Sequence, residues 1–373
     1  MTDEAYRSAV FDMVYLAACA VNGAVPDEAR VRRMDLEALY LAADRHAMTG
    51  VTAMALESAG VKQAAFTQAK GKAIRKVAAF DVERAAVLAK LEEAGVWYMP
   101  LKGSVLKDLY PRLGMRQMAD VDILFDGART KEARAVMEGL GFSAESTWGR
   151  GNHDHYFKPP ICHFELHRTL FGAAHDARLV RYYQNVKDRL IRDEGGGCGF
   201  HFREEDFYLY MIAHEYKHYS GSGTGLRSAL DTYVYLKKRG DGLDWSYIAA
   251  ELNRLELTDF EAQNRGLALH LFEGGELTAR EERMLEELLS SGTYGTIQKR
   301  VRNGVGRYGD GALGKTRYLF SRLFPPMNVV RSAFPFFARH PILLPILPGY
   351  RIVRELTFRK EKLWAELTAL LKL

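Results

Sequence analysis

The position of the strand-like segments constrains the fold more than any other feature of this sequence. Short apolar and aromatic runs, which are typical of β-strands, fall in the middle of the chain, at residues 96–101, 121–125, 156–159 and 161–167. On both sides, apolar residues recur at the spacing of an α-helix, as over residues 63–95, where Gly95 is a suitable C-cap. We therefore predict an α+β fold, in which a small mixed sheet is flanked by N-terminal and C-terminal helical regions.

The chain, at 373 residues, is too long for one ordinary hydrophobic core. Helical patterns resume after the glycines at 195–197 and predict helices over residues 204–219, 226–238, 245–255, 282–289 and 351–373. Residues 301–350 are rich in Gly, Pro and Arg and are left unassigned. The predicted units are an N-terminal helical region (1–94), a core that contains the sheet (95–198), a helical domain beside it (199–296) and a C-terminal segment (297–373).

The cysteines and the first residues bear on the cellular compartment. The three cysteines lie far apart, which argues against a disulfide framework and suits a reducing compartment. The start, Met1 to Glu4, is acidic and lacks the basic and apolar runs of a signal peptide. The most apolar late stretch, 341–350, contains three prolines and is shorter than the roughly 20 residues that a membrane span needs. We therefore predict a cytoplasmic protein without a transmembrane segment.

Charge is distributed unevenly along the chain. The net charge is +5, but residues 297–373 contain 15 Lys and Arg against 4 Asp and Glu, a balance of +11. A basic segment of this kind suits nucleic acid, anionic lipid or a phosphate-rich ligand, and it is also typical of a solvated surface. The charge balance therefore fits several kinds of partner, and it fits equally a surface that binds no partner.

Two aspartates, Asp120 and Asp122, stand at the start of the apolar run 121–125. Side chains alternate between the two faces of a strand, so these carboxylates point to the same side. Two carboxylates beside an apolar run repel one another unless a cation lies between them, and Mg²⁺ prefers oxygen ligands of this type. An isolated pair of this kind is also common on a solvated strand.

Two further segments strengthen the metal hypothesis. Leu101-Lys102-Gly103-Ser104 joins a strand to a predicted helix, where a glycine allows the backbone to approach a phosphate. Ser104 is a suitable cap for that helix. Downstream, Phe164-Glu165-Leu166-His167 supplies a third carboxylate in a strand-like run, with Glu165 and His167 on one face.

These motifs, in this order, resemble the signature of the polymerase-beta-like nucleotidyltransferase superfamily. More narrowly, the chain resembles a bacterial family of uncharacterised nucleotidyltransferases. The residues that carry this resemblance are Leu101-Lys102-Gly103, Leu109-Tyr110, Arg116 and Glu165-Leu166-His167, followed by His214 to His218, Arg227 to Asp231 and, more loosely, the proline-rich segments 324–326 and 341–348. Arg168 departs from the family, whose members often have an aromatic residue there. The N-terminal helical region carries no part of the resemblance.

The resemblance implies a transfer of a nucleoside monophosphate from a nucleoside triphosphate, such as ATP, to an acceptor. Asp120, Asp122 and Glu165 would be catalytic and would bind two Mg²⁺ ions, or Mn²⁺, with Glu165 beside the acceptor. The residues that would contact the nucleotide or support the site are Lys102, Gly103, Ser104, Arg116, His167, His214, Lys217 and His218. The acceptor (a small molecule, tRNA or a protein) and the oligomeric state are left open.

Two other functions are weighed against this one. His214-Glu215-Tyr216-Lys217-His218 matches the H-E-x-x-H pattern of zinc peptidases, but Thr224 stands where one class of them has its third histidine. These histidines are also compatible with a packed helix. The second alternative is a non-catalytic protein that binds nucleotide or RNA. His153 and His155 alternate in a polar strand, which either lines the cleft or forms a solvated edge.

Overall fold

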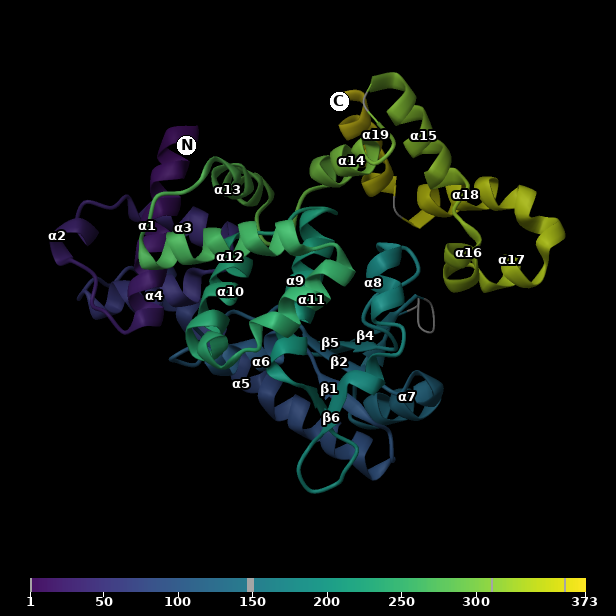
Figure 1. Ribbon diagram of the computed structural model, residues 1–373, viewed down its shortest axis with the longest axis horizontal. Helices are drawn as coiled ribbons and strands as arrows, with labels where there is room; N and C mark the ends of the chain where they lie inside the picture. The colour runs from purple at the N-terminus through teal and green to yellow at the C-terminus, as the bar shows by residue number, and fades with distance from the viewer. Residues whose placement is uncertain (1, 146–150, 310, 359) are drawn as a thin grey trace.

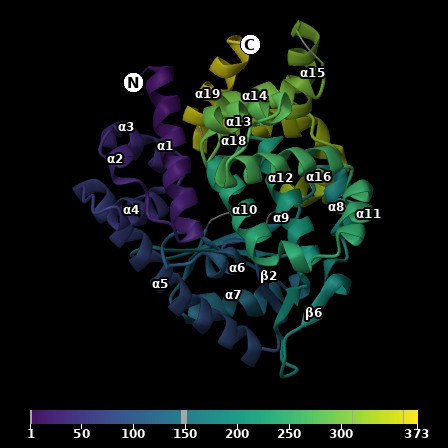
Figure 2. The ribbon, with the colours of Figure 1, turned by 60° about the vertical axis from the view of Figure 1, so that its left-hand side comes forward.

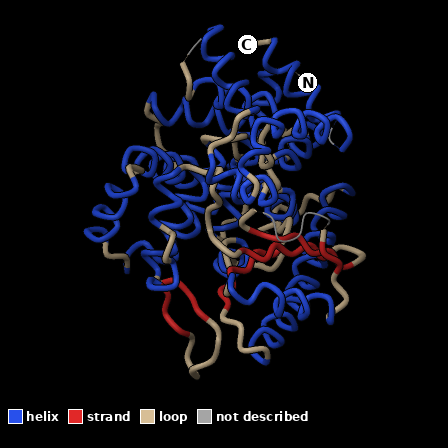
Figure 3. The backbone as a smooth tube through the Cα atoms, turned by 90° about the vertical axis from the view of Figure 1, so that its right-hand side faces the viewer, coloured by secondary structure: helices blue, strands red, loops and turns tan. Residues whose placement is uncertain are grey.

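The computed structural model describes residues 2–145, 151–309, 311–358 and 360–373. The predicted α+β fold is confirmed: a five-stranded mixed sheet and a separate two-stranded sheet lie among helices (Figure 1, Figure 3). The strands are β1 (Tyr98–Pro100), β2 (Val121–Phe125), β3 (Ser143–Ala144), β4 (His153–Lys158), β5 (Cys162–His167), β6 (Leu190–Arg192) and β7 (Phe200–Phe202).

The large sheet has the strand order β1-β2-β5-β4-β3, in which only β2 and β5 are parallel. This parallel pairing places Asp122 directly opposite Glu165. The strand predicted over 156–159 begins earlier, at His153, because the polar residues before it pair with β5 along their whole length. On its other side, β4 pairs with β3 through Tyr156 and Phe157.

Two helices, α5 (Ala64–Glu93) and α7 (Thr130–Gly139), cover one face of the sheet (Figure 2). Apolar residues of α5 such as Phe80 pack there against Phe164 of β5. The predicted helix over 63–95 is confirmed: Gln63 accepts a hydrogen bond from the first turn, and Gly95 follows the helix with φ of +64°. Because most apolar side chains of β2 and β5 pack on this face, their polar side chains lie on the opposite face.

The opposite face of the sheet lies under α9 (Glu204–Tyr219), with α8 (Ala177–Tyr182) and α11 (Trp245–Leu255) beside it. The helices predicted over 204–219 and 245–255 are confirmed with the same bounds. After β1, the chain forms a short helix α6 (Gly103–Leu106) and a 3₁₀ turn η1 (Lys107–Leu109), so the helix predicted there begins at Gly103.

The N-terminal helices share one hydrophobic core with helices that follow the sheet in sequence. Tyr233, for example, donates a hydrogen bond of 2.8 Å to Asn22. The first group is α1 (Asp3–Asn22), α2 (Glu28–Val31), α3 (Leu36–Arg45) and α4 (Thr49–Ser58), and the second is α10 (Leu226–Arg239), α12 (Thr258–Glu273) and α13 (Ala279–Ser291). The sequence does not predict α12. The domain boundaries stay predictions.

The C-terminal helices lie at the upper right of Figure 1. They are α14 (Ile297–Gly306), α15 (Gly311–Leu323), α16 (Met327–Ala333), α17 (Pro335–Arg339), α18 (Leu347–Phe358) and α19 (Lys360–Leu371). The helix predicted over 351–373 is confirmed in α18 and α19, apart from residue 359, which lies outside the described residues. Among the described residues, no helix is long and apolar enough to cross a membrane.

Candidate functional site

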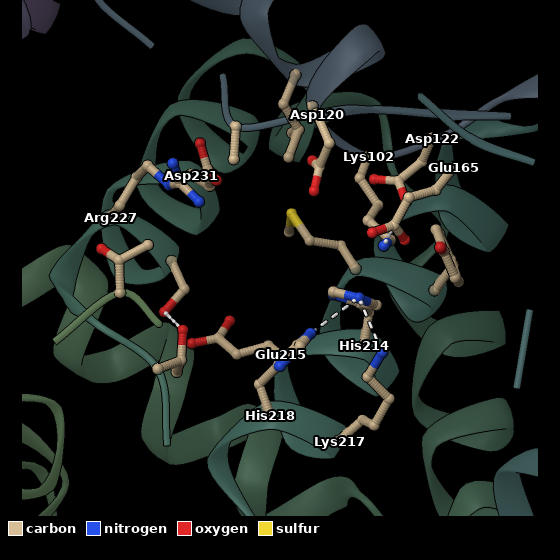
Figure 4. Close-up of a pocket in the computed structure, with 18 of the residues that line it drawn as sticks. Lys102, Asp120, Asp122, Glu165, His214, Glu215, Lys217, His218, Arg227 and Asp231 are labelled. Atoms are coloured by element: carbon tan, nitrogen blue, oxygen red, sulfur yellow. Dashed lines mark hydrogen bonds and ion pairs between the residues drawn. The ribbon is translucent and has the colours of Figure 1, made fainter. Parts of the chain in front are cut away.

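A cavity of about 390 Å³ lies between the polar face of the sheet and helices α9 and α10 (Figure 4). Its size falls within the range of small-molecule sites. The sheet side of its lining includes the predicted residues Lys102, Gly103, Arg116, Asp120, Asp122, Glu165 and His167, and the helix side includes His214, Lys217 and His218. The structure thus brings together ten of the eleven predicted site residues, and Ser104 is the exception.

The three carboxylates form one wall of this cavity. Asp122 on β2 faces the same side as Asp120, just before the strand, and it lies opposite Glu165 on the parallel neighbour β5. Burial, together with the negative charges of Asp122 and Glu165, raises the pKa of Asp120 to about 6. The wall therefore concentrates negative charge where water is scarce.

Asp122 has two hydrogen-bonding partners in this wall. Lys102 Nζ lies 3.1 Å from its Oδ1, and His167 Nε2 lies 2.7 Å from the same oxygen. Burial would raise the pKa of Asp122, but the Lys102 charge and the His167 hydrogen bond outweigh it and hold that pKa well below its usual range. His167 also lowers the pKa of Glu165 against the effect of burial. Asp122 and Glu165 are therefore ionised at neutral pH.

The turn from β1 into α6 presents Lys102 to Asp122. Lys102 has φ of +42°, a backbone conformation that lysine rarely adopts, and it directly precedes α6. A side chain at Gly103 would place its Cβ 2.6 Å from Arg116 Nη1, so a larger residue would have to displace this buried arginine. Ser104 is buried outside the cavity lining, its hydroxyl has no hydrogen-bond partner among the residues that the structure describes, and it does not cap the helix.

The wall opposite the carboxylates is formed by one face of α9. His214 Nε2 lies 3.3 Å from Lys217 Nζ and 3.2 Å from His218 Nε2 (Figure 4). Burial and the nearby charge of Lys102 lower the pKa of Lys217 to about 7. Burial likewise lowers the pKa of His214 well below its ordinary value. This wall therefore gains positive charge when an anion enters and raises these pKa values.

The glutamate of the H-E-x-x-H pattern is engaged elsewhere. Glu215 accepts a hydrogen bond of 3.0 Å from Asn264 on α12, and burial raises its pKa to about 7. Within the described residues, the groups of three potential metal ligands include neither His214 nor His218. In the described part of the chain, no third ligand therefore lies close enough to His214 and His218 to form a zinc site of the peptidase type.

Arg116, predicted to neutralise phosphate charge, lies in the cavity wall with its own charge already paired. Its guanidinium donates two hydrogen bonds of 2.8 Å to Asp231 of α10, and the Tyr110 hydroxyl donates one of 2.7 Å to the same carboxylate. All three side chains are buried. This ion pair links the loop before β2 to the helical wall.

Arg227 and His153 also line the cavity. Arg227, at the start of α10, lines the cavity, donates to the carbonyl of Gln117, and forms no ion pair within the described part of the chain. His153 of β4 also lines the cavity, with Nε2 3.6 Å from Glu165 Oε2. Arg227 fell within the family resemblance, and His153 lay in the polar alternation of its strand. Neither signal alone placed them beside the carboxylates.

The carboxylate wall suits a hard divalent cation. Its oxygen donors are those that Mg²⁺ and Mn²⁺ prefer, and the repulsion that raises the pKa of Asp120 would be relieved by a cation between the three carboxylates. A group made by Glu165 with His153 and His167 also has its ligand atoms within 4.8 Å of one another. Residues of this chain therefore fit the metal that the resemblance implies.

A comparison with protein families identifies the class of this protein as the nucleotidyltransferases. The pair of aspartates and the third carboxylate on a parallel strand agree with that class. The chain belongs to a family of uncharacterised nucleotidyltransferases, whose model matches residues 32–273. The match includes all predicted site residues together with Arg227. It also begins within the N-terminal helical region, so the expectation that this region carries no resemblance is wrong from residue 32 onward. No curated protein and no solved structure matches the chain.

Proposed function

We propose that this protein transfers a nucleoside monophosphate from a nucleoside triphosphate to the hydroxyl of an acceptor. The observation that carries the proposal is the parallel register that sets Asp122 against Glu165, with Asp120 on the same wall and basic side chains on the wall opposite. Carboxylates on the sheet wall suit metal ions, and basic side chains on the helical wall suit a triphosphate.

In this proposal, Asp120, Asp122 and Glu165 hold two Mg²⁺ ions, or Mn²⁺. When bound, such ions neutralise the charge of the triphosphate and lower the pKa of an attacking hydroxyl. Lys102, which lies 3.1 Å from Asp122, is then available to the phosphates. Lys217 and Arg227 approach the same anion from the helical wall.

The reaction follows from the charges of the two walls. The acceptor oxygen attacks the α-phosphorus and loses its proton to Glu165, which is ionised because its pKa is lowered. The bond between the α-phosphorus and the bridging oxygen breaks, and pyrophosphate leaves with the electron pair. Lys217, once protonated, and Arg227 stabilise the charge of this leaving group.

Thermal unfolding tests the proposal. Wild type and the Asp120→Ala/Asp122→Ala variant are melted with each of the common nucleoside triphosphates and Mg²⁺, with Asp241→Ala, an exposed aspartate, as the control. Ligand at about 100 times its Kd stabilises a fold by about 2.7 kcal/mol, which is a shift of several degrees. We expect this shift in wild type and in the control and its loss in the double variant. A shift that persists in the double variant contradicts the proposed site.

A further inference from the structure

A second group of potential metal ligands lies on the same face of the sheet, and its two histidines are outside the cavity lining. It consists of His155 on β4 with His163 and Glu165 on β5. The antiparallel register sets His155 directly opposite Glu165, and alternation along β5 puts His163 on the same face. His155 and His163 do not line the cavity, so the proposed nucleotide reaction leaves them without a role.

The ligand atoms of this outer group converge. His155 Nδ1 lies 3.1 Å from His163 Nε2 and 3.4 Å from Glu165 Oε1. Ligand atoms held about 2.0–2.1 Å from a tetrahedral Zn²⁺ lie roughly 3.3 Å apart, which is close to both separations. Without an ion, the two imidazoles share one hydrogen bond.

Neighbouring rings hold His163 in this position. The exposed ring of Phe157 stacks on it, with centroids 4.6 Å apart and an interplanar angle of 5°. The His155 ring lies 5.3 Å from it at 20°. The group is half-buried rather than closed, so an ion can reach it from solvent while Phe157 shields one side.

We propose that His155, His163 and Glu165 form a second metal site that takes a divalent transition ion such as Zn²⁺ or Co²⁺, with water completing the coordination. Two imidazoles and one carboxylate favour such ions over Mg²⁺, which prefers oxygen ligands. Glu165 Oε1 faces this outer site, while its Oε2 lies 3.4 Å from His167 and 3.6 Å from His153 on the cavity side. An ion in the outer site therefore fixes the orientation of a carboxylate that also faces the cavity.

Cobalt binding tests this site in the full-length chain. Metal is removed with a chelator, Mg²⁺ is added to saturate the oxygen ligands of the cavity, and Co²⁺ is titrated while the visible absorption of nitrogen-ligated cobalt is recorded. We expect one equivalent to bind to wild type. His155→Ala and His163→Ala should each lose this band or bind at least roughly tenfold more weakly. Melting curves of the metal-free variants show whether each has folded.

Two controls separate this site from other sources of binding. His201→Ala removes an exposed imidazole that also lies 2.6 Å from a carboxylate, that of Asp193, and should keep the band. Asp122→Asn should keep the band and lose the stabilisation by Mg²⁺ and triphosphate, so the two proposals fail separately. The absence of a band in wild type, its persistence in folded His163→Ala, or its loss in Asp122→Asn alone would each overturn the outer site.

Discussion

The two walls of the cavity reach opposite charges by different means. The sheet wall contains Asp120, Asp122 and Glu165, and strand register sets the last two opposite each other. The charges of Asp122 and Glu165 are fixed because their pKa values are lowered. The α9 wall carries Lys217, whose pKa of about 7 leaves it half-charged near neutrality. The sheet wall thus keeps at least two negative charges at neutral pH, whereas the positive charge of the α9 wall depends on whether Lys217 is protonated.

The largest effect is expected when one of the fixed negative charges of the sheet wall is removed. Asp122→Asn should lower turnover by on the order of 10³-fold, since electrostatic groups at a reacting centre contribute about that much. The fold should persist, because the amide has the shape of the carboxylate and its oxygen can still accept a hydrogen bond from Lys102 or His167. Pyrophosphate release measures the first effect and circular dichroism the second. Asp108→Asn, which changes an exposed aspartate outside the cavity lining, is the control, and normal turnover by Asp122→Asn would remove the assignment.

The ion pair between Arg116 and Asp231, which links the two walls, can be removed in a separate experiment. Asp231→Ala leaves the buried guanidinium of Arg116 without its partner, which should cost about 3–5 kcal/mol in the free energy of unfolding. Denaturant unfolding measures this loss. Glu273→Ala, which removes the partner of Lys237 in an exposed pair with a separation of 3.7 Å, should cost under about 1 kcal/mol.

A second substitution decides whether the unpaired charge causes that loss. Adding Arg116→Met to Asp231→Ala removes the stranded cation and should restore part of the stability. If the double variant is as unstable as the sum of the two single variants, the ion pair does not join the walls in the way described.

The role of Lys217 in the α9 wall can be tested by measuring triphosphate affinity over a series of pH values. Bound triphosphate should raise the pKa of Lys217 above its value of about 7 in the free protein, so binding takes up a proton. The affinity of wild type should therefore fall, by up to about tenfold per pH unit, as pH rises above about 7. Lys217→Met should bind roughly tenfold more weakly at about pH 7, and the part of the pH dependence due to this proton should disappear. Calorimetric titration of Mg²⁺ and triphosphate measures both, and an unchanged pH slope in Lys217→Met would contradict the assignment.

The sequence predicted those features that depend on local alternation and capping. The bounds of β2, α9 and α11 follow from apolar runs and helical spacing, and the shared face of Glu165 and His167 follows from the pleat of β5. It missed α12, because two polar residues of that helix point inward. Glu261 accepts from the Tyr208 hydroxyl, and Asn264 donates to Glu215, so the apolar stripe is interrupted.

The helices within residues 301–350 were left unassigned for another reason. Glycine normally disfavours a helix, but Gly304 of α14 packs where a Cβ would lie 2.5 Å from the Tyr318 ring of α15. The packing between these helices needs the glycine, so tertiary contact overrides its low propensity. Only the folded chain reveals that requirement.

Contacts between residues far apart in the sequence limit how much of the site could be predicted. Arg116 has the right charge and position in sequence for a phosphate ligand, yet Asp231, far along the chain, holds its guanidinium. Arg227 reaches the cavity because α10 packs over the loop before β2, where Gln117 accepts its hydrogen bond. A motif predicts the carboxylates, but it does not reveal which nearby cations are already paired.

The contact between Lys102 and Asp122 has a consequence for how this chain matures. A cluster of acidic groups would oppose its own assembly if the chain had to wait for an ion from solution. Here the residue directly after Leu101 carries a tethered ammonium group to Asp122 at 3.1 Å. The newly made chain can therefore complete its fold with an internal counter-ion, and in the proposed function the binding of metal would exchange one cation for another.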